Sequence, residues 1–453
     1  MSDQRYPSHK TDLRQLAWHV MRAALKAVDP ARAVKTYFET HPDLETRIKA
    51  TSGRIIVVGA GKAGGPMVAA VSQIFGDQIT SGRVIVKYGH ASAAESADAP
   101  DGLAKITVVE AGHPVPDQAG LSGTRQIAKM LSEVGPDDTV LCLISGGGSA
   151  LLTLPAEGIS LSDLQATTEC LLAAGATINE FNTIRKHLSA VKGGRLAQIA
   201  APATVYTLIL SDVVGDPLEV IASGPTVPDP TTFADAWAII ERYGLQDELP
   251  VGARHRLQAG CAGDVPDTPK PGDPVFERVV NNIIGSNRIA AGAAVKAAQA
   301  AGFEARLLST WIEGEAREVG KVMAGLAKGL ARDEGLIPRP SCLVAGGETT
   351  VTLKGHGRGG RNQELALAAA IALAGWPDLL IACLGTDGAD GPTDAAGAFA
   401  DGETVGRART KGLAAIDYLN RNDAYHFFAP LDDLIMTGPT QTNVNDLTLI
   451  FAR

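Results

Sequence analysis

Two arginines and a lysine share one glycine-rich stretch in the second half of the chain. Residues 354–364 read KGHGRGGRNQE, with Lys354, Arg358 and Arg361 as the cations. Glycine lets the backbone approach a ligand closely, and guanidinium groups in such a loop suit bidentate recognition of phosphate or carboxylate. The helix expected from about Gln363 would add the partial positive charge of its N-terminus. We interpret the stretch as an anion site, with a tight turn carrying solvated arginines as the alternative.

A serine- and glycine-rich loop is a second candidate for anion binding. The apolar run 138–144 predicts a buried strand. The loop that follows it consists of Ser145, Gly146, Gly147, Gly148 and Ser149. Consecutive backbone N–H groups flanked by hydroxyls can cradle a phosphate. A flexible turn is the alternative interpretation.

A lysine lies inside a glycine turn nearer the start of the chain. Residues 59–64 read GAGKAG, a GxGxxG pattern between an apolar strand and a helix, which is the context of a dinucleotide-binding turn. Two features weaken a nicotinamide site. The next strand, 84–86, ends in Lys87 where an acidic residue would bind a ribose diol, and Lys62 would point at a phosphate or a substrate anion. The turn is not a Walker A motif, because Ala63 follows the lysine.

Carboxylates follow two other predicted strands. Asp212 comes directly after the strand 204–210, a common place for a metal ligand or a base, although it could also cap a turn. Asp387 and Asp390 alternate with glycine after the strand 379–384. This pattern is typical of a loop that binds a divalent cation, but it lacks the spacing of a calcium-binding EF-hand. A cluster of Asx turns is the alternative.

Two further cations lie on a predicted helix. Helices are expected at 160–174 and 179–190, and the second carries Arg185 and Lys186. A solvated helix face explains this pair as well as an anion-binding role does.

Composition limits the classes of function. The 45% hydrophobic and 20% charged residues are those of a soluble globular protein, and the net charge of −9 disfavours general binding to nucleic acid or a membrane surface. The five cysteines show no metal-binding spacing, which indicates a reducing, cytoplasmic compartment. The N-terminus has no apolar segment typical of a secretory signal, and no run is long enough to span a membrane.

The chain of 453 residues is too long for one hydrophobic core, so two domains are expected. We predict an N-terminal α/β domain at 1–245 and a C-terminal α/β domain at 280–453. Residues 246–279, which contain glycine-proline clusters and show little periodicity, are predicted to connect them. The amphipathic helix 11–28 is expected to pack on the first domain, and the alternating residues 350–353 predict a separate strand.

The predicted strands end repeatedly in polar, glycine-rich loops. In open α/β sheets, polar chemistry gathers at the carboxyl ends of the strands. Phosphoryl transfer needs lysine and arginine for charge neutralisation, carboxylates for a metal and a loop that cradles phosphate. The predicted loops contain all of these parts.

Seven motifs, in order along nearly the whole chain, resemble the glycerate 2-kinase family with its C-terminal MOFRL domain. They read GAGKAGGPM, LISGGGSALL, RKHLSAVKGGRLA, LSDVVGDPLEVIASGPTVPD, GGETTVTLKGHGRGGRNQELALA, GTDGADGPTDAAGA and TGPTQTNVND. One position departs from the family pattern, Gln441, where a glycine would be expected. The resemblance implies two α/β/α domains, the first Rossmann-like, with a MOFRL region at about 340–450 and an active-site cleft between the domains.

The resemblance also implies an activity. Members of this family transfer the γ-phosphate of ATP to the 2-hydroxyl of D-glycerate with Mg²⁺, which gives 2-phosphoglycerate and ADP. Some members carry the name hydroxypyruvate reductase, so an NAD(P)H-dependent reductase is the alternative. The catalytic lysine of the family falls on Lys62, and its arginine falls on Arg361 or, as second choice, Arg358.

The motifs and the resemblance together give a set of candidate residues. Lys62, Arg361 and Asp212 are the catalytic candidates, and Asp387 and Asp390 are the candidates for holding Mg²⁺. Substrate and phosphate binding is predicted for Ser145, Gly146, Gly147, Gly148, Ser149, Arg358, Asn362, Glu348 and Asn287. Only small molecules are expected as partners, and a homodimer is left open. A non-catalytic sensor of sugar acids is disfavoured, because no output segment is visible.

Overall fold

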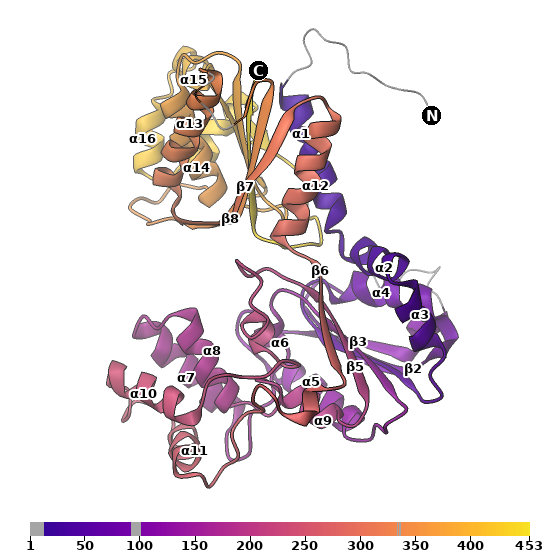
Figure 1. Cartoon of the computed structure of the whole chain (residues 1–453). Helices are drawn as coiled ribbons and strands as arrows, with labels where there is room; N and C mark the ends of the chain where they lie inside the picture. The colour runs from indigo at the N-terminus through magenta and orange to yellow at the C-terminus, as the bar shows by residue number, and fades with distance from the viewer. Residues whose placement is uncertain (1–12, 92–100, 333, 335–336) are drawn as a thin grey trace. The chain divides into compact units, whose positions relative to one another are not determined.

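The computed structural model describes residues 13–91, 101–332, 334 and 337–453. The N-terminal segment that bears on a secretory signal, and the first two residues of the helix expected at 11–28, lie outside the described residues. The described chain forms two compact α/β units (Figure 1). The first unit is Pro30–Ile284, and the second combines residues 13–29 with Gly285–Arg453.

The sheet of the first unit has six strands in the order β3-β2-β1-β4-β5-β6. They are β1 (Ile55–Ala60), β2 (Ile79–Lys87), β3 (Ile106–Ala111), β4 (Thr139–Ile144), β5 (Thr204–Leu210) and β6 (Val279–Gly285). From β3 to β5, neighbouring strands are parallel. This is the strand order of dinucleotide-binding folds, and it reverses between β1 and β4. The prediction of a Rossmann-like first domain is therefore confirmed.

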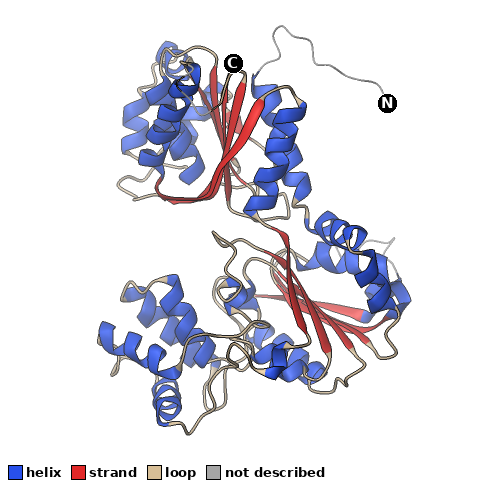
Figure 2. Ribbon diagram, in the orientation of Figure 1, coloured by secondary structure: helices blue, strands red, loops and turns tan. Residues whose placement is uncertain are grey.

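Helices cover both faces of this sheet (Figure 2). They are α2 (Pro30–Thr40), α3 (Pro42–Lys49), α4 (Gly64–Phe75), α5 (Gln118–Leu131), α6 (Gly148–Leu151) and α9 (Arg195–Ala200). Alternate residues of a strand point to opposite faces. Accordingly, Ile55 and Val57 of β1 pack with α2 and α4, whereas Ile56 and Val58 pack with α5. Burial on both faces explains why these strands read as continuous apolar runs.

Four helices of the first unit share a hydrophobic cluster of their own. They are α7 (Leu161–Ala173), α8 (Ile178–His187), α10 (Phe233–Tyr243) and α11 (Val251–Ala262). The predicted helices at 160–174 and 179–190 are confirmed as α7 and α8. The interpretation of 246–279 as an irregular connection is wrong for α11 and for the start of β6. In α11 only Ala253 and Leu257 are buried, too few residues to give a periodic signal.

The sheet of the second unit is mixed, in the order β11-β10-β9-β12-β8-β7. Its strands are β7 (Glu304–Glu315), β8 (Ser341–Thr350), β9 (Leu379–Gly385), β10 (Gly397–Asp401), β11 (Leu434–Ile435) and β12 (Asp446–Ala452). Strand β12 lies antiparallel between β8 and β9. The separate strand predicted at 350–353 does not form; β8 ends at Thr350, and a loop follows.

One face of this sheet is covered by α1 (Leu13–Ala27) and α12 (Asn287–Ala300), which run side by side in Figure 1. The expectation that the first helix packs on the N-terminal domain is therefore wrong. The small buried side chains of α12, such as Ala290 and Ala294, let α1 approach closely. Arg14 also ties α1 to this sheet through ion pairs with Asp401 and Asp433 at 2.7 and 2.5 Å.

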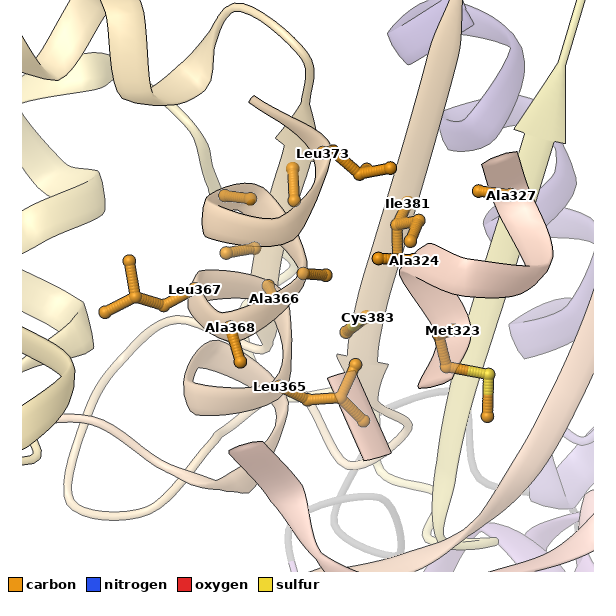
Figure 3. Packing of buried hydrophobic residues seen from close by; sticks show 14 of the residues in the cluster. Met323, Ala324, Ala327, Leu365, Ala366, Leu367, Ala368, Leu373, Ile381 and Cys383 are labelled. Carbon is orange, nitrogen blue, oxygen red and sulfur yellow. The ribbon is translucent and has the colours of Figure 1, made fainter. Parts of the chain in front are cut away.

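The opposite face carries α13 (Ala316–Ala331) and α14 (Arg361–Leu373). The shorter helices of the unit are α15 (Thr404–Thr410), α16 (Ala415–Asn420) and α17 (Ala424–Phe428). Figure 3 shows Leu365 of α14, Ile381 of β9 and Met323 of α13 among the side chains of one buried hydrophobic cluster. This burial fixes α14, and with it the position of Arg361 at its first residue. No helix in the described part of the chain is long and apolar enough to cross a membrane.

Candidate active site

The loops that follow β1 and β4 are fastened to each other where the strand order reverses. The N–H of Lys62 donates to the carbonyl of Gly146 at 2.9 Å, and the N–H of Ala63 donates to Oγ of Ser145 at 3.0 Å. Gly61, with φ of 148°, lies so close to Ser145 that a Cβ atom would overlap with it. The lysine turn and the serine-glycine loop therefore form one structure.

The N–H groups of the lysine turn all donate within the protein. Besides the two bonds just described, Gly61 donates to the carbonyl of Ile85 at 3.0 Å and Gly64 to that of Gly61 at 3.1 Å. In a dinucleotide-binding turn, N–H groups at this place would face the pyrophosphate. The GxGxxG pattern is therefore present without its usual free donors.

The loop after β4 has the opposite character. Within the described part of the chain, the N–H groups of Gly146, Gly147 and Ser149 donate no hydrogen bond to the protein. Gly147 is in the left-handed region, with φ of 84°. Successive free N–H groups in such a conformation form a concavity that suits an oxyanion. This geometry favours the predicted phosphate-binding role of the loop over a merely flexible turn.

Two basic side chains flank this loop. A Cβ atom on Gly147 would lie 2.9 Å from Cδ2 of His113 and 3.5 Å from Cε of Lys62. Burial, and then the charge of Lys62, lower the pKa of His113 to about 4, so the imidazole is neutral at pH 7. Sequence reasoning assigns no role to His113. The available signal is its position in a glycine-proline turn after an apolar run, now β3.

Asp212 lies on the other side of the same loop. Its carboxylate is so close to Gly146 that a Cβ atom at position 146 would overlap with it. Strands β4 and β5 are parallel neighbours, so the residues that follow them meet at one edge of the sheet. The structure thus brings Lys62, Asp212 and the serine-glycine loop together, as the sequence predicts.

A further set of polar residues supports Ser149. Its Oγ lies 3.1 Å from Oγ of Ser223, which in turn donates to Oδ1 of Asn182 at 2.9 Å. Nζ of Lys192 donates to the carbonyls of Ser149 and Leu152 at 2.8 and 3.0 Å. Burial, and then the charge of Arg185, lower the pKa of Lys192 to about 7.

The backbone around Ser223 is strained. Ala222 and Ser223 have φ of 51° and 61°, in the left-handed region that costs a non-glycine residue about 1–2 kcal/mol. Such strain is concentrated at functional sites in proteins. The motifs RKHLSAVKGGRLA and LSDVVGDPLEVIASGPTVPD supply Lys192 and Ser223, and Asn182 lies outside both. That these residues meet at Ser149 could not be predicted from spacing.

Arg361 and its neighbours form a second group, within the second unit. Its Nε and Nη2 donate to Asp446 at 2.5 and 3.1 Å, and its Nη1 donates to Glu348 at 2.7 Å. Burial acts to lower the pKa of Arg361, but the hydrogen bonds and charge of Asp446 raise it above its usual range. Glu348 also accepts a hydrogen bond from Asn445 at 2.8 Å. The guanidinium is therefore already neutralised by two carboxylates, which the prediction of an open anion site did not anticipate.

The N-terminus of α14 is also occupied by the protein. Asp390 accepts hydrogen bonds from the N–H groups of Asn362 and Gln363 at 3.1 and 2.8 Å. The expectation that this helix end attracts a ligand anion is corrected by this capping carboxylate. Burial raises the pKa of Asp390 to about 7, although these N–H groups act to lower it. The exposed Asp387 accepts a hydrogen bond from the N–H of Ala389 at 3.1 Å. This contact matches the alternative interpretation of the loop as a cluster of Asx turns.

The predicted metal ligands do not form a cage. Among the described residues, no three His, Cys, Asp or Glu side chains are grouped so that they could hold a metal ion. Magnesium commonly binds through one or two carboxylates plus substrate phosphates and water, so a cage of protein ligands is not required. Asp387, with an exposed carboxylate, fits such a role better than Asp390, whose two oxygens cap α14.

A pocket of about 820 Å³ lies beside this second group. Arg361, Asn362, Asp387 and Asp390 line it, together with the glycine loop that precedes α14. Its volume is within the range of small-molecule sites.

Three of the four binding residues predicted in the second unit are not among the residues that line this pocket. Arg358 stacks on the ring of Tyr425 at 5.2 Å and donates to the carbonyl of Pro392, which matches the solvated-arginine alternative. Glu348 pairs with Arg361. Asn287 is buried, and its Nδ2 donates to the carbonyls of Val444 and Asp446 at 2.8 and 2.9 Å. Its observed role is to hold the start of β12.

Comparison with known proteins decides the family. Residues 16–258 match the family described as Domain of unknown function (DUF4147), and residues 341–446 match the MOFRL family. The D-glycerate 2-kinase of Thermotoga maritima is 42% identical over 96% of this chain and 98% of its own length. The chain belongs to the glycerate 2-kinase family. The resemblance inferred from the seven motifs is thereby confirmed.

Two other relatives of this glycerate 2-kinase family member are informative. The crystal structure of a glycerate kinase from T. maritima has a TM-score of 0.88 and 41% identity, covering 97% of this chain and 99% of that one. A protein of Agrobacterium vitis named as a hydroxypyruvate reductase is 44% identical over 96% of this chain and 94% of its own length. Both names that the resemblance implied therefore occur among the relatives.

Proposed function

We propose that this protein is a glycerate 2-kinase that transfers the γ-phosphate of ATP to the 2-hydroxyl of D-glycerate. One observation carries the proposal. The free N–H groups of Gly146, Gly147 and Ser149 lie beside Lys62 and Asp212, at the point where the strand order reverses. Open α/β sheets bind ligands at such points. The glycerate kinase names of relatives with about 40% identity support the choice of substrate.

The residues of the first unit have distinct roles in this proposal. Phosphoryl transfer depends mainly on positioning and on neutralising the charge of the equatorial oxygens. The loop 145–149 holds phosphate oxygens of the nucleotide through its free N–H groups. Lys62 neutralises the migrating phosphoryl group. Asp212 accepts a hydrogen bond from the 2-hydroxyl, orients its oxygen for attack on the γ-phosphorus, and takes up the hydroxyl proton as the new P–O bond forms and the bond to the ADP oxygen breaks.

The group around Arg361 is assigned to substrate and metal. A bound carboxylate would compete with Glu348, the more exposed of the two carboxylates that pair with Arg361. Asp387 would contribute one ligand to Mg²⁺. Bound there, the ion would neutralise charge on phosphate oxygens.

A nicotinamide-dependent hydroxypyruvate reductase is the second candidate. The name of the A. vitis relative and the GxGxxG pattern favour it. The donors of the lysine turn weigh against it, because each is bonded within the protein. Strand β2 also ends in Lys87, which cannot accept hydrogen bonds from a ribose diol.

A two-armed assay of the purified protein separates the candidates. One arm supplies D-glycerate, ATP and Mg²⁺, measures ADP release, and identifies the position of the phosphate by ³¹P NMR. The other arm supplies hydroxypyruvate with NADH or NADPH. ADP release with 2-phosphoglycerate as product supports the kinase. A 3-phosphoglycerate product would refute the 2-position, and nicotinamide oxidation without ADP release would refute the kinase altogether.

A further inference from the structure

Arg185 is a half-buried cation in α8 that pairs with no acid. Among the described residues it contacts no carboxylate, and its guanidinium lies over the ring of Phe181 at 4.9 Å. Its sequence neighbour Lys186 is different, because it forms a buried ion pair with Asp229 at 3.1 Å. Burial lowers the pKa of Arg185, which agrees with the lack of a nearby negative charge. The alternative of a solvated helix face does not fit a side chain in this environment.

The face of α8 that carries Arg185 is fastened to the loop after β4. Asn182 lies one turn earlier on the same face, since residues three apart on a helix are neighbours. Asn182 accepts a hydrogen bond from Ser223, whose hydroxyl lies 3.1 Å from that of Ser149. Arg185 is therefore carried on the helix face that contacts the loop with the free N–H groups.

A second cation lies close by. Lys192 is almost fully buried, and its Nζ donates to the carbonyl of Ser149. Burial, and then the charge of Arg185, lower the pKa of Lys192. Two like charges without a carboxylate are costly in a partly buried place. A bound anion would remove that cost.

The available groups specify the chemistry of that anion. The loop offers the N–H groups of Gly146, Gly147 and Ser149, and the face of α8 that is fastened to this loop carries the guanidinium of Arg185; all of these groups are donors. A phosphoryl group has three acceptor oxygens and up to two negative charges, which matches a set of donors converging from several directions. The strained left-handed Ser223 is further support, because strain of this kind is retained where it presents a group for function.

We propose that Arg185 binds a phosphoryl group at the 145–149 loop, together with the free N–H groups of that loop. This inference rests on the proposed function, because it deepens the phosphate-binding role of the same loop. The phosphoryl group belongs either to the nucleotide or to the phosphorylated product. The two sources share one chemistry and are separated by the test.

The test measures binding without turnover. ADP and 2-phosphoglycerate are titrated separately into the full-length protein by calorimetry, using wild type, Arg185→Met, Arg185→Lys and the control Arg256→Met. Arg256 is a half-buried arginine of α11 in the same helical cluster, and its Nε donates to the carbonyl of His187 at 2.9 Å. The control therefore reports disturbance of the cluster without loss of the phosphate contact. Thermal unfolding shows that each variant is folded.

We expect Arg185→Met to weaken one ligand at least about tenfold, since charge-assisted bonds are the strong ones. Arg185→Lys should recover only part of the lost ligand affinity, because lysine cannot form the two parallel hydrogen bonds that a guanidinium forms. If ADP binding is weakened, the phosphoryl group at Arg185 belongs to the nucleotide. If only 2-phosphoglycerate binding is weakened, it belongs to the product. Equal affinities for wild type and both Arg185 variants, or an equal loss in Arg256→Met, would overturn the proposal.

The outcomes also separate this inference from the proposed function. In one outcome the wild type forms 2-phosphoglycerate, and Arg185→Met keeps the wild-type KM for ATP and the wild-type ligand affinities. The proposed kinase function then stands, and the proposed role of Arg185 is refuted. In another outcome the wild type releases no ADP with glycerate but binds ADP in a way that depends on Arg185. That result refutes the proposed kinase function and supports the phosphoryl site at Arg185.

Discussion

Gly146 and the carboxylate of Asp212 lie in direct contact, although 66 residues separate them in the sequence. The contact arises because β4 and β5 are parallel neighbours, and each residue follows the end of its strand. It joins the backbone that offers free N–H groups to the acid that we assign to the attacking hydroxyl. The absence of a side chain at position 146 is what allows this contact.

Gly146→Ala should therefore impair catalysis more than folding. The added Cβ would overlap with the end of a flexible side chain, so Asp212 can rotate away while the loop stays in place. We expect kcat to fall at least about tenfold, as expected when a reacting group is misplaced, with little change in melting temperature. The control is Gly135→Ala in the same unit, where the nearest atom is 3.9 Å from the new Cβ. Unchanged kcat in Gly146→Ala would show that Asp212 does not orient the hydroxyl.

Lys62→Met should abolish most activity and leave the fold intact. The backbone N–H of Lys62 fastens the two loops, so removing the ammonium does not break that bond. Loss of a group that stabilises developing charge typically costs about 10²–10³ in kcat. The assay is initial-rate ADP release, with circular dichroism to check folding. Lys105→Met, an exposed lysine paired with Asp77, is the matched control. Full turnover in Lys62→Met would remove Lys62 from the mechanism.

Arg361→Met should destabilise the second unit as well as impair substrate binding. The substitution leaves the carboxylate of Asp446 without its charged donor, although the side chain of Asp446 is only 10% exposed. An unsatisfied buried group costs about 1–3 kcal/mol. Adding Asp446→Asn to Arg361→Met should recover part of that loss, which a double-mutant cycle of urea unfolding measures. Arg358→Met, which removes a surface guanidinium, is the control. Additive single effects would contradict the coupling of Arg361 and Asp446.

The first unit should become less stable as the pH is lowered, because of His113. Its pKa is about 4 in the folded protein and 6.5 ordinarily, so between these values the unfolded chain binds a proton that the folded chain does not. Stability from this group is therefore full above about pH 6.5 and declines until about pH 4. His113→Asn should flatten this decline, as measured by hydrogen exchange of β1 and β4 across that range. His255→Asn, at an exposed position of α11, should keep the wild-type slope. An unaltered slope in His113→Asn would refute the assignment.

Local patterns were sufficient to predict the elements that carry the site. The apolar runs before Lys62, Ser145 and Asp212 are strands β1, β4 and β5, because strands buried on both faces read as continuous apolar segments. The helices α7 and α8 were likewise predicted. The pattern failed where few residues are buried, as in α11, and where a strand simply continues, as β8 does through Gly346 and Gly347.

By itself, the sequence determined the fold class, the family and the polar loops that follow the strands, because these depend on composition, period and motif order along the chain. Only the tertiary structure decided which loops meet and how each charge is used. Strand order brings Lys62 to Gly146 and Asp212. The packing of α14 pairs Arg361, its first residue, with Asp446 of β12, and Asp390 turns from a predicted metal ligand into the cap of α14. The hydrogen-bonded partners named here are 27 to 85 residues apart. A hydrogen bond depends on distance in space, which local spacing in a sequence does not specify.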